Sequence, residues 1–486
     1  MSQEIRNLKP KAIWNFFADI NAIPRASKKE ENIIAHMVAF GKKLGLETKV
    51  DAAQNVLIRK AATQGMEHRK TVVLQAHLDM VHQKNTSSEF DFETQGIAME
   101  ISNGWVHAKE TTLGADNGIG VAAIMGVLAS KEIPHPSIEA LFTVDEETGM
   151  TGAMGLAPGY LDGDILLNLD TEDDDEISIG CAGGVDITAT ETYQEYAIPS
   201  QSVAFQISVC GLQGGHSGMD IHKGLGNANK IMNRLLWEGQ QKFDLAIANF
   251  KGGGLRNAIP RECKATIVLH QKFKKTFEHA FSSWADLVSK EFQTLEKNLC
   301  IELQSTTLPD KIMAKETQKK FILSVYACHD GIFRMSPAIP DLVETSNNLA
   351  RITLENGTIE IANLCRSFSE SGKKDLTNAI RSTFELANFK VNISGDYPGW
   401  EPNTRTEILA VLKNTYENMF GAAPNIQACH AGLECGILGR NYPDMEMISF
   451  GPTIKGAHSP DEKVNISSTQ KFWAYLKEIL KNIPKK

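Results

Sequence analysis

Seven side chains suited to metal chemistry stand at, or just after, the ends of short apolar runs. They are His77, Asp79, Asp116, Glu146, Glu147, Asp170 and His458. Imidazole and carboxylate groups are the ligands that zinc accepts where it keeps a position open for water. The repetition of this arrangement along the chain predicts a catalytic metal centre.

The number of donors matches what a two-metal centre needs. Two zinc ions take about three protein ligands each, and a carboxylate that bridges both reduces the requirement to five side chains. Five of the candidates meet that requirement: His77, Asp116, Glu147, Asp170 and His458. Asp79 and Glu146 are then left for other tasks.

Spacing suggests what those two remaining residues do. Asp79 stands two residues after His77, so an extended backbone points both side chains to one side, where the carboxylate can orient the imidazole. Glu146 and Glu147 are adjacent and point in different directions. We therefore expect Glu147 to hold metal and Glu146 to act as general base.

The apolar runs that precede the candidates are typical of buried strands in an α/β fold. They cover residues 71–75, 138–144, 164–169 and 445–450, with a small-residue helix expected at 119–130. In open α/β sheets, sites form at the carboxyl ends of strands, so distant residues converge there. We predict a catalytic domain with a mostly parallel central sheet flanked by helices.

An α+β module interrupts this pattern. Longer alternating strands and amphipathic helices begin near Thr188, and the α/β texture returns after Tyr397. The predicted domains are a catalytic domain in two parts, 1–187 and 397–486, and an inserted lid at 188–396. Within the lid, the strands at 265–270 and 359–366 are each followed by a polar helix, at 274–292 and 373–387, which predicts an internal duplication.

Composition narrows the class of protein. A chain of 486 residues exceeds what one core usually serves, and its 42% hydrophobic and 22% charged residues are typical of a folded protein. With a net charge of −9 and no Lys/Arg-rich run, we expect no nucleic-acid partner. No signal-like or membrane-spanning segment stands out, and the eight cysteines lack CxxC spacing. These features predict a cytoplasmic protein with reduced thiols and no membrane partner.

Several motifs resemble the co-catalytic zinc aminoacylase/carboxypeptidase/dipeptidase family. They are Gln75-Ala76-His77-Leu78-Asp79, Gly114-Ala115-Asp116-Asn117-Gly118, Asp145-Glu146-Glu147-Thr148-Gly149, Asn168-Leu169-Asp170 and Gly456-Ala457-His458-Ser459-Pro460. The segments Gly180-Cys181-Ala182-Gly183-Gly184 and His430-Ala431-Gly432-Leu433-Glu434 look like its aminoacyl-histidine dipeptidase branch. The resemblance spans nearly the whole chain.

The resemblance implies a role for each candidate. One Zn²⁺ would be held by Asp116, Glu147 and His458, and the other by His77, Asp116 and Asp170, with Co²⁺ or Mn²⁺ as substitutes. Glu146 would be the general base. The matching lid positions, implied to bind substrate, are His216, Asn257, Arg366 and Gly432. The fork of a guanidinium suits a peptide's C-terminal carboxylate, and an imidazole can donate to the developing oxyanion.

The activity implied is that of a di-zinc dipeptidase acting on Xaa-His and other dipeptides through a zinc-bound hydroxide, with Glu146 as general base. The alternatives are a tripeptidase or N-acyl-amino-acid deacylase of the same layout, or a non-catalytic metal-binding scaffold. The resemblance also implies a homodimer. In related enzymes with a single-module lid, a histidine of the partner subunit completes the site. The doubled lid predicts completion by the chain's own His216 and Arg366, with hinges near Thr188 and Tyr397.

Overall fold

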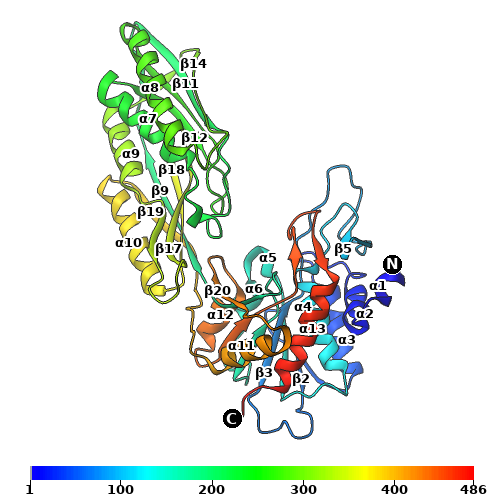
Figure 1. Cartoon of the computed structure of the whole chain (residues 1–486). Helices are drawn as coiled ribbons and strands as arrows, with labels where there is room; N and C mark the ends of the chain where they lie inside the picture. The colour runs from blue at the N-terminus through cyan, green and yellow to red at the C-terminus, as the bar shows by residue number, and fades with distance from the viewer. Residues whose placement is uncertain (1–2) are drawn as a thin grey trace. The chain divides into compact units, whose positions relative to one another are not determined.

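A mixed sheet of eight strands forms the centre of the first of two units into which the chain divides (Figure 1). The structure is a computed structural model that describes residues 3–486. Unit 1 contains the chain up to Cys181, Trp400–Ala428 and Leu433–Lys486, and unit 2 contains Ala182–Gly399 and Cys429–Gly432. The second unit is thus an insertion, joined by one short segment from later in the chain.

The central strands of unit 1 run parallel. In spatial order the sheet consists of β1 (Glu47–Val50), β2 (Val56–Lys60), β6 (Ile138–Thr143), β3 (Val72–His77), β7 (Ile165–Asn168), β21 (Glu446–Ser449), β8 (Glu176–Cys181) and β20 (Asn425–Cys429). The pairs β6–β3, β3–β7 and β7–β21 are parallel, whereas β1, β2 and β8 pair antiparallel. Every residue of β3, β6 and β7 is buried, as expected for parallel strands covered on both faces.

Helices and a small second sheet complete unit 1. The helices are α1 (Gln3–Asn7), α2 (Lys11–Ile20), α3 (Glu31–Lys43), α4 (Ala115–Ala129), α5 (Glu146–Gly149), α6 (Thr151–Gly155), α11 (Glu407–Phe420), α12 (Glu434–Asn441) and α13 (Ile466–Lys481). Helix α4 is almost entirely buried and packs on β3 and α2. The four-stranded sheet consists of β22 (Ile454–Lys455), β23 (Lys463–Asn465), β5 (Trp105–Ala108) and β4 (Met99–Ser102).

Unit 2 is built on an antiparallel sheet of nine strands. Eight lie in the order β14 (Cys300–Thr306), β11 (Ser202–Cys210), β13 (Cys263–His270), β12 (Ala246–Gly252), β17 (Val343–Glu355), β18 (Thr358–Ser367), β9 (Gly183–Thr192) and β19 (Lys390–Tyr397), and β16 (Gly331–Met335) adds to β17. Helices α7 (Ala228–Phe243), α8 (Lys274–Phe292), α9 (Lys315–Ala327) and α10 (Glu370–Leu386) line one face of it (Figure 1). A continuous apolar core lies between the helices and the sheet.

The sheet of unit 2 consists of two copies of one topology. The first copy runs β11–α7–β12–β13–α8–β14, and the second runs β9–α9–β17–β18–α10–β19. Numbered within each copy, the strands lie in the same spatial order, 4-1-3-2, and the copies meet where β12 pairs with β17. The first copy is inserted in the chain between the first strand and the first helix of the second. The predicted fold class, including the duplication, is confirmed.

The predicted hinge residues lie inside strands. Thr188 is in the middle of β9 and pairs with Asn392, and Tyr397 ends β19 opposite Gly184. The chain passes between the units at 181/182 and 399/400, six residues before the boundary predicted at 187/188 and three after that predicted at 396/397, and again at 428/429 and 432/433. The start of β9 is rich in glycine, which carries little strand propensity, so its sequence is typical of a loop rather than a strand.

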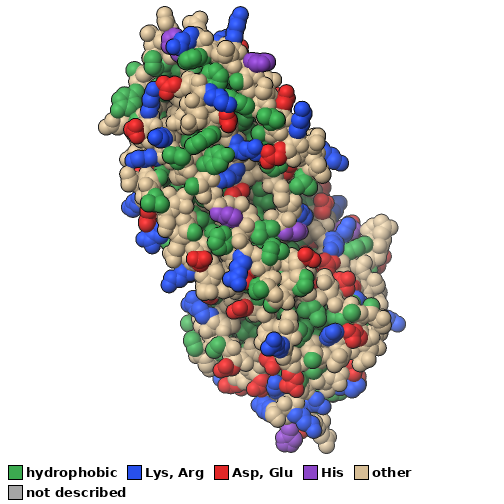
Figure 2. Space-filling model, turned by 60° about the vertical axis from the view of Figure 1, so that its left-hand side comes forward, with side chains coloured by type: hydrophobic (Ala, Val, Ile, Leu, Met, Phe, Trp, Pro, Cys, Tyr) green, Lys and Arg blue, Asp and Glu red, His purple; other side chains and the backbone are tan. Residues whose placement is uncertain are grey.

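The cysteines, the apolar character of the helices and the surface charges bear on the predicted class of protein. All eight cysteines are free thiols. None of the helices within residues 3–486 combines the length and apolar character needed to cross a bilayer. On the face drawn in Figure 2, Lys and Arg side chains are interspersed with Asp and Glu side chains rather than gathered in one area.

Candidate metal centre

Three neighbouring parallel strands end beside one another and present most of the predicted ligands. His77 is the last residue of β3 and lies level with the last residue of β6. Glu146 and Glu147 follow β6 after Asp145, whose φ is 52°. Asp170 follows β7 by two residues. The sheet therefore brings these side chains to one crevice at the carboxyl ends of its strands.

Two further candidates reach the strand ends from other elements. Asp116 stands in the first turn of α4, two residues after Gly114, which is left-handed with a φ of 71°. His458 lies in the loop between β22 and β23, with a φ of 64°. Both residues are thus placed by tight turns rather than by regular structure.

Asp116 lies between the two histidines, with one oxygen toward each. Its Oδ1 is 3.1 Å from Nε2 of His77, and its Oδ2 is 3.2 Å from Nε2 of His458. Asp170 Oδ1 is 3.5 Å from the same nitrogen of His77, and Glu147 Oε2 is 3.0 Å from that of His458. Two groups of three result, each with donor atoms within 4.8 Å of one another, and they share Asp116.

This donor set fits divalent cations. Oε1 of Glu147 is buried with no hydrogen-bond partner among the described residues, and burying a carboxylate oxygen unpaired costs free energy. Burial also raises the pKa of Asp170 to about 6, against the attraction of His77. A cation held by Asp116, Glu147 and His458 would give the Glu147 oxygen the partner that it lacks. A cation held by His77, Asp116 and Asp170 would favour the charged form of Asp170. The groups have the membership that the family resemblance implies.

Asp79 fixes the orientation of His77. Burial raises the pKa of Asp79, but the hydrogen bond and charge of His77, together with hydrogen bonds from Ser27 and the Glu146 backbone, lower it below its usual value. Nδ1 of His77 is 3.3 Å from Asp79 Oδ1, which also accepts from the backbone N–H of Glu146 at 3.0 Å. The other oxygen accepts from the N–H of Glu147 at 3.2 Å and from Ser27 Oγ at 2.8 Å. Nε2 of His77 is therefore the atom left for a metal.

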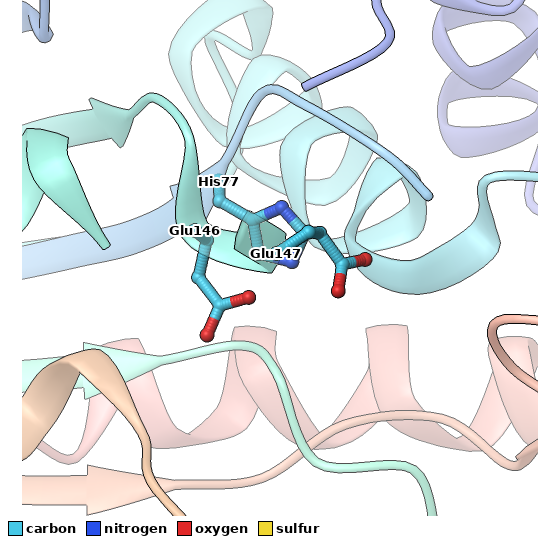
Figure 3. A group of neighbouring side chains, drawn as sticks. All are labelled: His77, Glu146 and Glu147. Atoms are coloured by element: carbon cyan, nitrogen blue, oxygen red, sulfur yellow. The ribbon is translucent and has the colours of Figure 1, made fainter. Parts of the chain in front are cut away.

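Glu146 and Glu147 direct their carboxylates to different sides of His77 (Figure 3). Glu146 belongs to neither group that shares Asp116, although its donor atoms lie within 4.8 Å of those of His77 and Glu147. Burial raises the pKa of Glu146 well above its usual value; the charge of His77 opposes this, and that of Asp170 adds to it. A carboxyl group with a raised pKa beside metal ligands is suited to proton transfer.

The four residues predicted to bind substrate all lie in unit 2. Nδ1 of His216 accepts from the backbone N–H groups of Gly218, at 3.2 Å, and Met219, at 3.0 Å. The proton of the neutral ring must then be on Nε2, which is free to donate. Burial lowers the pKa of His216 to about 4, and the charge of Arg366 adds to this, so the ring is neutral near pH 7.

Arg366 is held by its neighbours in the same unit. It is 5% exposed, and its Nη1 donates to the Tyr397 hydroxyl at 2.8 Å while its Nε lies 3.4 Å from Ser217 Oγ. The backbone carbonyl of Asn257 accepts from the N–H of Ser217 at 2.8 Å, and the Asn257 side chain is exposed. Gly432 lies in the short segment that joins unit 2. Unit 2 thus brings His216, Asn257 and Arg366 together around Ser217.

Comparison with known proteins identifies the family. Residues 73–482 match the model of Peptidase family M20/M25/M40. Cytosol non-specific dipeptidase of Escherichia coli (strain K12) is 42% identical over 483 residues, which is 99% of this chain and 100% of that protein. The chain belongs to peptidase family M20/M25/M40. Aminoacylhistidine dipeptidase of Vibrio alginolyticus, 45% identical, has a crystal structure that superposes with a TM-score of 0.93 over 100% of this chain and 99% of that one.

The fold is also similar to that of a solved structure with low sequence identity. Aminopeptidase PepT of Bacillus cereus is 15% identical, with a TM-score of 0.58 over 98% of this chain and 99% of that one. The two-unit architecture is therefore kept at identities where little of the sequence remains. This chain is an M20 metallopeptidase with a cluster of candidate metal ligands at its strand ends.

A row of buried polar side chains lies beneath the candidate metal ligands of this peptidase. We did not predict these residues from the sequence. Gln75, Asn168 and Ser449 are neighbours on β3, β7 and β21. Asn168 Nδ2 donates to Gln75 Oε1 at 2.5 Å, and Ser449 Oγ donates to Asn168 Oδ1 at 2.5 Å. The row ties the three strand ends together beneath the metal ligands. Polar residues within otherwise apolar strands were the signal that could have revealed them.

Glu434, the first residue of α12, is hydrogen-bonded to this row of polar side chains. Its Oε2 accepts from Gln75 Nε2 at 2.6 Å and from Thr143 Oγ1 at 2.7 Å, and its Oε1 is buried without a hydrogen-bond partner among the described residues. Burial raises the pKa of Glu434 to about 7. Nothing in the local sequence of Glu434 indicates that α12 begins beside the strand ends, so its position could not be predicted from the motif that contains it.

Proposed function

We propose that this chain is a metal-dependent dipeptidase that hydrolyses Xaa-His and other dipeptides. The observation that carries the proposal is the pair of donor groups that share Asp116, beside the carboxyl group of Glu146, which neither group includes. Relatives named cytosol non-specific dipeptidase and aminoacylhistidine dipeptidase match nearly the whole chain, which supports dipeptides as the substrates.

The proposed cofactor is a pair of Zn²⁺ ions, for which Co²⁺ or Mn²⁺ can substitute. His77, Asp116 and Asp170 would hold one ion, and Asp116, Glu147 and His458 the other. Bound zinc would polarise the scissile carbonyl group and make a water molecule easier to deprotonate. Asp79 would keep Nε2 of His77 directed toward Asp116.

The remaining steps fall to the chain's own side chains. Glu146 takes a proton from the attacking water and returns it to the nitrogen of the leaving amine. The Nε2–H group of His216 donates a hydrogen bond to the carbonyl oxygen as that oxygen gains negative charge. Arg366 binds the C-terminal carboxylate of the substrate, which selects short peptides. Asn257 and Gly432 complete the substrate-binding set.

A substrate panel separates this proposal from its alternatives. Purified protein loaded with zinc is assayed against dipeptides that include Xaa-His, against tripeptides, and against N-acetyl amino acids. We expect dipeptides to give the highest kcat/KM. Faster cleavage of tripeptides would indicate a tripeptidase, and faster cleavage of the N-acetyl compounds a deacylase. Metal binding without any hydrolysis would indicate the non-catalytic scaffold.

We further propose a homodimer in the cytoplasm. The name of the Escherichia coli relative places that protein in the cytosol, and the homodimer follows from the family resemblance. Light scattering of the purified protein tests the oligomeric state, and a mass of a single chain would contradict it.

A further inference from the structure

The turn that carries Asp116 is held by a buried carboxylate from a distant loop. Glu462 is 2% exposed, and it accepts from four consecutive backbone N–H groups. Its Oε2 accepts from Leu113 at 2.7 Å and Gly114 at 2.9 Å, and its Oε1 accepts from Ala115 at 2.7 Å and Asp116 at 3.2 Å. Leu113 and Gly114 precede α4, and Ala115 and Asp116 are in its first turn, so none of these N–H groups has an acceptor inside the helix. Glu462 therefore takes the place of a helix cap.

The carbonyl side of the same turn is held by two residues that follow α2. Arg25 is 2% exposed, and its Nη2 donates to the Gly114 carbonyl at 2.5 Å while Asn21 Nδ2 donates to that of Leu113 at 3.0 Å. Nη1 of Arg25 donates to the carbonyls of Leu78, at 3.0 Å, and Asp79, at 2.9 Å. One guanidinium therefore links the segment after His77 to the segment before Asp116.

The space around Gly114 leaves no room for a side chain. A Cβ atom at this left-handed position would collide with Nη2 of Arg25 and with the sulfur of Met80, 2.8 Å away. The glycine turn is thus packed between Arg25 on one side and Glu462 on the other. The loop of Glu462 also carries His458, four residues earlier, so one loop supplies both a candidate ligand and the carboxylate that fixes Asp116.

Two buried charges are a costly way to stabilise a turn. Burial lowers the pKa of Arg25 to about 10 and raises that of Glu462, which means that the protein environment disfavours both charged forms. Well-packed apolar residues usually stabilise a fold at least as well as buried charges do. What the charges add here is a fixed position for the backbone on which Asp116 and His77 are carried.

We propose that Glu462 and Arg25 are positioning residues that set Asp116, and with it both metal sites, in their binding geometry before any metal arrives. The inference rests on the proposed two-metal centre. Neither residue is proposed to touch a metal ion or the substrate. Their effect is exerted through the backbone of residues 113–116 and 78–79.

The first experiment compares metal binding by Glu462→Gln and by a matched control. Gln keeps the size of the side chain, but its NH2 group faces two of the four N–H donors. The control is Glu296→Gln in unit 2, because Glu296 is also 2% exposed and accepts from the backbone N–H groups of Gln213 and Gly226, each at 2.8 Å. Co²⁺ affinity is measured by competition with a chromophoric chelator, together with the visible spectrum of the bound cobalt.

We expect Glu462→Gln to weaken Co²⁺ binding about 10- to 100-fold and to alter the cobalt spectrum, as loss of residues that orient metal ligands does. Arg25→Lys keeps the positive charge but loses the guanidinium group that bonds to both segments, so it should weaken Co²⁺ binding as well. Glu296→Gln should leave affinity and spectrum unchanged. A folded Glu462→Gln variant with the parent's affinity and spectrum would overturn the proposal. A parent that binds no metal would instead contradict the proposed function.

The second experiment uses the parent sequence and does not depend on whether a variant folds. Hydrogen exchange is followed by mass spectrometry in peptides that cover residues 111–117, in chelator-treated protein. The N–H groups of residues 113–116 have no acceptor within α4, so their protection reports on Glu462. We expect slow exchange without metal. Rapid exchange that slows only after metal is added would show that metal, not Glu462, orders the turn, and would refute the inference.

Discussion

Glu146 and Glu147 are adjacent in sequence, yet their surroundings suit them to different tasks. Glu147 lies 3.0 Å from His458 and shares a donor group with Asp116. Glu146 lies outside the two groups that share Asp116, and its pKa is raised by burial and by neighbouring carboxylates. A ligand must stay deprotonated, whereas a general base must gain and lose a proton.

Replacing Glu146 by Gln should separate catalysis from metal binding. The amide keeps the shape of the side chain but cannot accept the proton of water, so we expect kcat to fall by about 10²- to 10⁴-fold. Elemental analysis should show the parent's metal content, and circular dichroism the parent's fold. Near-normal turnover in this variant would refute the role of Glu146 as the base.

The two oxygens of Asp116 face different histidines, which gives it a unique place among the proposed ligands. Asp116→Ala should therefore weaken both metals, while Glu147→Ala and Asp170→Ala each weaken mainly one. Metal per chain, measured after extensive desalting, decides the matter. If Asp116→Ala retained two tightly bound metals, the bridging role would be untenable.

Regular strands made the ligands predictable. Each apolar run marks a strand buried on both faces, and parallel strands bring their carboxyl ends to one edge of the sheet. His77, at the end of β3, and Glu147 and Asp170, just after β6 and β7, could therefore be placed together. Their mutual distances follow from the strand order, which the apolar pattern of a single sequence does not specify.

Contacts with the backbone were not predictable in the same way. Glu462 and Arg25 act on N–H and carbonyl groups, which every residue carries, so no side-chain pattern marks their partners. The first strand of the lid, β9, begins with glycines and carries no strand signal there. The short segment 429–432 joins unit 2 although its neighbours in sequence belong to unit 1, and only tertiary contacts reveal this.

That segment brings a buried histidine to β17. His430 is 6% exposed, its Nε2 lies 2.8 Å from Ser346 Oγ, and its ring packs 5.4 Å from that of Phe368. Burial lowers the pKa of His430 to about 3, and the charges of Arg366, His216 and His222 add to the effect. An unfolded chain would bind a proton at this residue near its usual pKa of about 6.5.

Acid should therefore destabilise unit 2 through His430. Because the pKa of His430 is lower in the folded protein than in the unfolded chain, its contribution to the free energy of unfolding is fully present above about pH 6.5. This contribution is lost as the pH falls toward the folded pKa, by up to about 1.4 kcal/mol per pH unit. His216 acts with the same sign. Between pH 7 and pH 5, the free energy of unfolding of the His430→Gln variant should fall by up to about 2 kcal/mol less than that of the parent. Urea unfolding of chelator-treated protein measures this, with exposed His279→Gln as control. Parallel pH profiles for the parent and His430→Gln would exclude the effect.

The doubled topology of unit 2 bears on how the catalytic site is completed. One chain carries two copies of the same βαββαβ arrangement, joined through β12 and β17. His216 follows the first strand of the first copy, and Arg366 lies in the third strand of the second copy, β18. Each copy thus carries one member of the proposed substrate-binding set.

We therefore expect His216 and Arg366 to serve the metal centre of their own chain, so that any homodimer is structural.

The test mixes inactive His216→Ala chains with inactive Glu146→Gln chains under conditions of subunit exchange, which is verified by co-purification of differently tagged chains. If the site is completed within one chain, every chain in a mixed dimer carries a defect in its own site and activity stays at the level of the separate variants. If the partner supplied His216, one site of each mixed dimer would combine an intact metal centre with an intact His216. Mixing would then restore up to about a quarter of the parent's activity, since random exchange makes half of the dimers mixed and each has one of two sites intact. Parent chains mixed with Glu146→Gln chains serve as the control for losses during exchange. Recovery toward that quarter would show that the site is shared between subunits and that the duplication serves some other purpose.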